Sequence, residues 1–103
     1  MNTTTKTLYP VEVQLDIFRQ LLTYEHLLED GCYLDIQKYA PDQMMRVTLW
    51  EKANPHEIPK DDPSKCWHVH RPHLFNLMRI HTARELDEAV ARWWASVPAN
   101  CKK

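Results

Sequence analysis

The amino-acid sequence predicts a small α+β domain in which an N-terminal helix, an antiparallel sheet of three to four strands and a C-terminal helix follow one another (α-β-β-β-α). Apolar residues recur with helical spacing near both ends of the chain, and they alternate with polar residues in its middle. The simplest arrangement packs both helices on one face of the sheet. With 103 residues, the chain is expected to make a single domain over residues 10–98. Flexible tails are expected at 1–9 and 99–103.

The first helix is predicted over residues 10–29. Pro10 suits the first turn of a helix, and Gly31 suits the position just beyond its end. Four apolar residues share one helical stripe: Val11, Leu15, Phe18 and Leu22. This stripe is expected to face the core, with Leu21 and Leu28 beside it. The stretch VEVQLDI also alternates with the period of a strand, so a short initial strand stays an alternative.

A hairpin is predicted next, from the segments YLDIQKY and MMRVTLWEK. Apolar residues alternate along both segments: Leu34 and Ile36 in the first, and Met45, Val47 and Leu49 in the second. Between them, Ala40-Pro41-Asp42-Gln43 has the composition of a turn. Two alternating runs joined by a short turn are typical of antiparallel strands.

Residues 53–65, ANPHEIPKDDPSK, contain three prolines and predict a loop that is long for a domain of this size. The stretch CWHVH that follows predicts a third strand, which Pro72 interrupts. Residues 73–80 either continue this strand, form another strand or make a short helical turn. The sequence leaves these three readings open.

The C-terminal helix begins with a capping box, TARE. Thr82 is expected to accept a hydrogen bond from the N3 amide, while Glu85 reaches back to the Thr82 amide. Four residues then line one helical face: Leu86, Val90, Trp93 and Val97. Pro98 is expected to end the helix.

Composition disfavours several classes of function. The net charge is −1, from 13 basic and 14 acidic residues without a basic stripe, which disfavours nucleic-acid binding. The single glycine excludes the glycine-rich loops that hold phosphates. No apolar stretch is long enough for a membrane span. The segment MNTTTKTLYP lacks the apolar run of a secretory signal, and three cysteines make an odd number, so we expect reduced thiols and a cytoplasmic location.

The element order resembles that of double-stranded-RNA-binding domains, a family that grips phosphate with a lysine cluster at the start of its last helix. Here that turn reads TARELDEA, where Arg84 stands among Glu85, Asp87 and Glu88. Acidic residues at a helix N-terminus stabilise the helix but repel phosphate. The resemblance carries over no site residue. Binding of single-stranded nucleic acid by stacked aromatic side chains stays an alternative function.

A metal site is the second alternative, because residues 66–73 read CWHVHRPH. Residues two apart share a strand face, so Cys66, His68 and His70 are expected to project together as zinc ligands. Alternate side chains along a strand are nevertheless about 6.5–7 Å apart, too far for three of them to hold one ion. Cys32, His73 or the aspartates of the preceding loop would have to complete the site. No sequence pattern of a catalytic nucleophile is present, and no catalytic residue is predicted.

Aromatic residues indicate the leading function. Helices on one face leave the other face of the sheet open, and this open face is expected to carry aromatic side chains beside an arginine. Trp, Tyr and Arg dominate the energetics of protein interfaces. The residues expected to bind a partner are Trp50, Trp67, Arg46, Tyr39 and Trp94. The sequence therefore predicts a protein-binding module, an adaptor or inhibitor without a cofactor, that uses this face and the 53–65 loop to bind another protein or itself.

Overall fold

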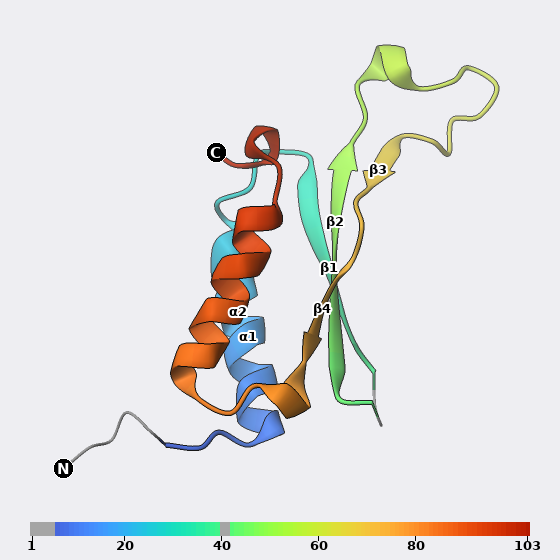
Figure 1. Ribbon diagram of the computed structural model, residues 1–103. Helices are drawn as coiled ribbons and strands as arrows, with labels where there is room; N and C mark the ends of the chain where they lie inside the picture. Colours follow the sequence, from blue (N-terminus) through green and yellow to red (C-terminus); the bar gives the residue numbers. More distant parts are fainter. Residues whose placement is uncertain (1–5, 40–41) are drawn as a thin grey trace.

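The computed structural model describes residues 6–39 and 42–103, and it confirms the α+β fold with both helices on one side of an antiparallel sheet (Figure 1). The elements are α1 (Pro10–Glu25), β1 (Cys32–Tyr39), β2 (Met44–Lys52), β3 (Trp67–Val69), β4 (His73–Asn76) and α2 (Ala83–Ser96). Of the predicted turn between β1 and β2, Ala40 and Pro41 lie outside the described residues, and Gln43 has a positive φ of 53°.

The strand β2 lies at the centre of the sheet. Its whole length pairs with β1 on one side, while β3 and β4 pair with successive parts of its other side. Pro72 stands in the interruption between these two short strands, where its missing N–H costs no ladder hydrogen bond. Within residues 73–80, His73–Asn76 form a strand and Leu77–Arg79 form a 3-10 turn.

The pairing register gives the sheet two different faces. Leu34 lies opposite Leu49 and Ile36 opposite Val47, and these side chains point toward the helices. Met45 and Phe75 continue this face on β2 and β4, with 2% of each side chain exposed. The alternate residues of the same strands form the opposite face, which no described helix covers (Figure 1).

The buried stripe of α1 differs from the expected one. Val13, Ile17 and Leu21 are completely buried against the sheet and α2. The predicted stripe of Val11, Leu15, Phe18 and Leu22 is exposed instead. The two stripes lie about 130° apart around the helix, at 3.6 residues per turn. Both have helical spacing, so periodicity alone could not select between them, and contact with the sheet and α2 does.

The capping box of α2 forms nearly as predicted. The Thr82 hydroxyl accepts a hydrogen bond from the Glu85 amide, while the Glu85 carboxylate accepts from the amide of His81, one residue earlier than expected. The predicted core residues of this helix are buried: Leu86, Val90, Trp93 and Val97. The cap fixes where the helix starts, and therefore which of its faces meets α1 and the sheet.

Both ends of the described chain are held against the domain. The Leu8 amide donates to the His81 carbonyl at 2.7 Å, just before α1. Residues 99–101 form a 3-10 turn, Cys101 is completely buried, and Lys102 pairs with Leu28. Residues 99–103 therefore pack as part of the domain, whereas the sequence predicted a tail there. Burial of the Cys101 side chain explains the difference.

Candidate functional site

Three aromatic rings form a cluster on the uncovered face of the sheet. Tyr33 and Trp50 are a directly opposed cross-strand pair, and their rings stack at 5.9 Å with an interplanar angle of 10°. The ring of Trp67 meets both edge-on, at 5.3 Å from Tyr33 and 6.4 Å from Trp50. Contacts of this kind fix the ring orientations, so the cluster is a preformed apolar surface.

A second group of side chains continues the face toward the other end of the sheet. Arg46 donates to the Gln37 side-chain oxygen at 2.6 Å, and its guanidinium lies 5.1 Å from the centre of the Tyr39 ring. Tyr39 also donates to the same Gln37 oxygen. A shallow depression of about 530 Å³ adjoins them, and Leu74 and Arg71 also line it. The planar groups of Arg46 and Tyr39 are thereby held in place on the sheet.

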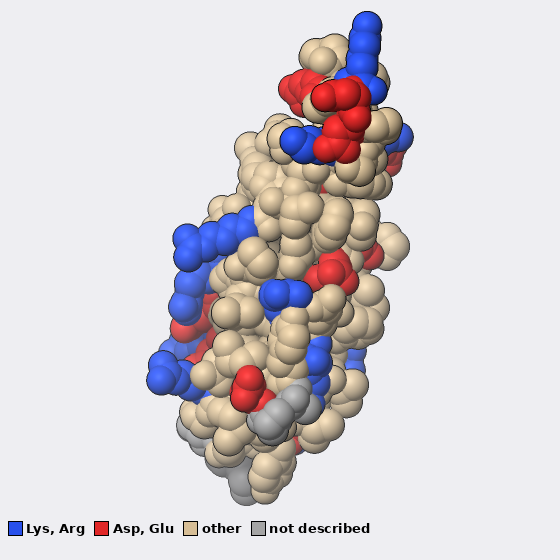
Figure 2. Space-filling view, turned by 90° about the vertical axis from the view of Figure 1, so that its right-hand side faces the viewer, with Lys and Arg blue, Asp and Glu red and all other residues tan. Residues whose placement is uncertain are grey.

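We call these residues the open sheet face: Tyr33, Tyr39, Arg46, Trp50, Trp67, Val69 and Leu74. Trp67 is 36% exposed, Val69 54% and Leu74 56%. Figure 2 shows uncharged side chains over most of this side of the molecule, with separate acidic and basic groups among them and more charged side chains on the projecting loop and along one margin. The structure thus brings together four of the five residues expected to bind a partner, Trp50, Trp67, Arg46 and Tyr39.

The fifth expected residue, Trp94, lies apart from this face. Its ring is 4.7 Å from that of Tyr24 on α1, and the Lys102 ammonium lies 4.8 Å from its centre. The 53–65 loop projects beyond the end of the sheet (Figure 1). Several of its residues surround a depression beside Trp67, including Glu57, Pro59 and Lys65. The loop therefore borders the aromatic end of the open sheet face.

A second exposed apolar surface runs along α1. We call it the outer stripe, formed by Val11, Leu15, Phe18 and Leu22. Val11 is 61% exposed and Leu15 59%. The spacing of four, three and four residues is the seam spacing of paired helices. The sequence analysis found this stripe but assigned it to the core, because a seam between two chains has the same spacing as a core face.

The histidine-rich segment does not form one site. His68 is exposed and lies 3.8 Å from the Glu57 carboxylate, whereas His70 lies 2.9 Å from the Glu51 carboxylate. Cys66 and His68, two ligands of the alternative metal site, do not belong to a converging group of ligands among the described residues. Among the described residues, the ligand atoms that converge are those of Glu51, His70 and Cys101, all within 4.8 Å of one another.

A fourth potential ligand, Cys32, extends this group. The Cys101 thiol lies beside the Cys32 sulfur and the Glu51 carboxylate. Asn100 donates to one Glu51 oxygen at 2.9 Å, and the His70 ring lies 2.9 Å from the other. Burial, together with these two neighbours, raises the pKa of Cys101 to about 12. The hydrogen bond from His70 holds the pKa of Glu51 below its usual value. Sequence reasoning offered Cys32 as an assisting ligand but missed Glu51 and Cys101, because neither lies near a spaced motif.

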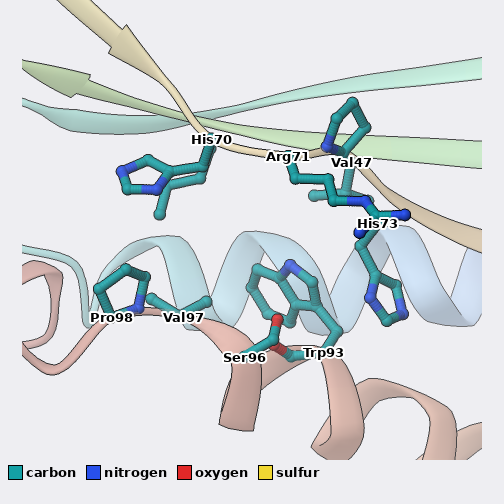
Figure 3. A pocket seen from close by; sticks show the side chains of 10 residues that line it. Val47, His70, Arg71, His73, Trp93, Ser96, Val97 and Pro98 are labelled. Atoms are coloured by element: carbon teal, nitrogen blue, oxygen red, sulfur yellow. The ribbon is translucent and has the colours of Figure 1, made fainter.

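A cavity of about 360 Å³ separates the His70–His73 segment from the end of α2 (Figure 3). His70 and His73 lie at its two ends, and Trp93 and Ser96 reach it from α2. Burial, assisted by Arg92, lowers the pKa of His73. The cavity has the size of a small-ligand site. Its lining contains apolar side chains together with imidazole, guanidinium and hydroxyl groups. The positions of these polar groups do not indicate one class of ligand.

Comparison with known protein families, with curated proteins and with solved structures gave no match to this chain. Within the described part of the chain, none of the helices has both the length and the apolar content needed to cross a membrane. The open sheet face, the outer stripe and the group around Cys101 are therefore interpreted from their own geometry.

Proposed function

We propose that this chain is a small cytoplasmic protein-binding module, an adaptor or inhibitor, which binds its partner through the open sheet face. The observation that carries the proposal is the preformed cluster of Tyr33, Trp50 and Trp67, in which Tyr33 and Trp67 are exposed and Trp50 is half-buried. Monomeric proteins rarely leave a contiguous aromatic patch in water, because its burial is favourable. Trp and Tyr are also the residues that dominate binding energy at interfaces.

The charges on and beside this face favour one kind of partner. By register, Arg46, Lys52 and Asp35 point to the same side of the sheet as the aromatic cluster, and the exposed Arg71 lies beside Arg46. Asp42 lines the same depression as Arg46 and Arg71, so three positive groups stand beside the two carboxylates of Asp35 and Asp42. The partner that fits is a protein with an apolar patch bordered by carboxylates, since complementary charge at the rim sets specificity and association rate.

Site-specific photocrosslinking tests this proposal. A photoreactive amino acid at Val69, inside the face, is expected to crosslink a partner that the same group at Ala91, exposed on the outside of α2, does not. The captured protein is then purified and its affinity measured. Trp67→Ala is expected to weaken binding by about 2 kcal/mol or more, roughly 30-fold, and Arg46→Glu to weaken it further at low salt.

The matched control is Leu27→Ala, which removes an exposed apolar side chain from another surface. It is expected to leave the affinity unchanged. Equal capture from Val69 and Ala91, or full affinity in Trp67→Ala, would overturn the proposal.

We also infer self-association through the outer stripe of α1, with a second copy of the chain as the occupant. Glu12 and Arg19 lie seven residues apart along the same flank of the stripe, and 77% of the Arg19 side chain is exposed. Within the chain, Glu12 pairs with Lys6 and Arg19 with Asp16. Antiparallel pairing of two copies brings each Glu12 toward Arg19 of the second copy. Charges that flank an apolar seam select the partner helix and its direction in this way.

Light scattering across a concentration series measures this association. The unmodified chain is expected to approach the mass of a dimer as its concentration rises. Leu15→Glu is expected to keep the monomer mass throughout, because it places a carboxylate in the middle of the seam. Leu27→Glu makes the same change at an exposed leucine outside the stripe and serves as the control. If the unmodified chain keeps the monomer mass at millimolar concentration, this result would contradict the inference.

A further inference from the structure

The ligand atoms of Glu51, His70 and Cys101 lie within 4.8 Å of one another, and Cys32 lies beside Cys101 at the edge of this group. The four residues come from four separate parts of the fold. Cys32 begins β1, Glu51 lies on β2, His70 follows β3, and Cys101 belongs to the last 3-10 turn. Cys101 lies beside Cys32 and Glu51, and the His70 ring forms a hydrogen bond with the Glu51 carboxylate at 2.9 Å. We propose that these four residues bind a zinc ion.

The chemistry of the four groups fits zinc better than other common ions. Thiolate sulfur and imidazole nitrogen are the ligands that zinc prefers, and a carboxylate completes many of its sites. Calcium and magnesium select oxygen ligands instead, and this group offers them a single carboxylate. Two cysteines, one histidine and one glutamate match the number of ligands of a tetrahedral zinc site.

The distances are close to those that zinc requires. In a tetrahedral site with metal–ligand bonds of about 2.0–2.3 Å, the ligand atoms are about 3.3–3.8 Å apart. The ligand atoms of Glu51, His70 and Cys101 already lie within 4.8 Å of one another. The Cys32 sulfur lies outside this group, so binding of all four ligands requires its side chain to rotate toward the other three. The backbone positions are set by the sheet and by the Leu28–Lys102 bridge. On binding, the two thiol protons pass to solvent and the metal takes their place.

The surroundings also resemble those of a metal site. The Asn100 amide holds one Glu51 oxygen at 2.9 Å, which is the kind of outer contact that orients a ligand carboxylate. Cys101 is completely buried, while 31% of the His70 side chain and 24% of the Glu51 side chain remain exposed. An ion can therefore enter from the side of Glu51 and His70 and reach the sulfur atoms inside. Zinc bound there ties the C-terminal segment to the sheet.

Titration of the reduced, untagged chain with cobalt(II), followed by displacement with zinc, tests the proposal. Cobalt in a tetrahedral thiolate site gives intense visible bands and sulfur-to-metal charge-transfer absorption. One cobalt ion per chain is expected, with both features present. Cys101→Ser, Cys32→Ser and His70→Ala are each expected to weaken binding by more than about 100-fold, and Asn100→Ala by about 10–100-fold.

Two matched controls come from the histidine-rich segment itself. Cys66→Ser and His68→Ala remove the same types of ligand from outside the group and are expected to bind cobalt as the unmodified chain does. Circular dichroism checks the fold of each variant. If Cys101→Ser fails to fold, Cys32→Ser at a half-buried position carries the test. Three results would overturn the proposal. The first is no cobalt binding by the reduced chain, and the second is loss of binding in the two controls. The third is a purified protein in which Cys32 and Cys101 form a disulfide and which binds no metal after that disulfide is reduced.

Discussion

Replacing Ile17 with alanine is expected to lower the free energy of unfolding by about 2–5 kcal/mol. The side chain is completely buried where α1 meets the sheet and α2. Its removal therefore loses the favourable free energy of burying this apolar group and leaves a cavity. A domain of this size is stable by about 5–15 kcal/mol in total, so the effect is a large part of its stability. Urea denaturation followed by circular dichroism measures it.

Leu15→Ala is the matched control for Ile17→Ala, two residues away on the same helix. Leu15 is 59% exposed, so in dilute protein we expect its loss to change the free energy of unfolding by no more than about 0.5 kcal/mol. The two variants distinguish the buried stripe from the outer stripe. A larger loss of stability in Leu15→Ala than in Ile17→Ala would mean that α1 is rotated from the orientation described above.

Phe75→Ala is expected to lower the free energy of unfolding by about 3–5 kcal/mol. Phe75 is 2% exposed, pairs with Met45 across the sheet, and its ring lies 4.8 Å from that of His73. It belongs to the buried core between the sheet and the helices, so its removal leaves a cavity. Its neighbour Leu74 points to the open sheet face and is 56% exposed.

Leu74→Ala is therefore expected to cost less than about 0.5 kcal/mol, when measured by the same denaturation. The contrast between adjacent residues is the signature of a strand with one buried face. Similar costs at both positions would instead indicate that residues 73–76 are not paired with β2 as a strand.

Local patterns of the sequence were sufficient for much of the fold. The capping box and the stripe of α2 were predicted correctly, because one apolar face and a strong cap leave little choice of rotation. The hairpin of β1 and β2 was also correct, since strict alternation fixes which side chains share a face. These two elements led to the α+β class and to the open sheet face with Trp50, Trp67, Arg46 and Tyr39.

Residues 73–80 and α1 were not decided by local pattern. The segment 73–80 has an apolar pattern that suits a strand or a turn, and pairing with β2 selects the strand for its first half. The helix α1 carries two apolar stripes of equal periodicity, and only contact with the sheet and α2 shows which one is buried.

The candidate zinc site depended most on tertiary structure. The sequence drew attention to CWHVHRPH, where the ligands are close along the chain but spread along a strand. In the folded chain, His70 meets Glu51 and Cys101, which lie 19 and 31 residues away along the sequence. The sequence by itself thus determined the elements, through periodicity and capping. Only the packing of those elements determined which apolar faces stay exposed and which distant ligands meet, because both depend on contacts between residues far apart in the chain.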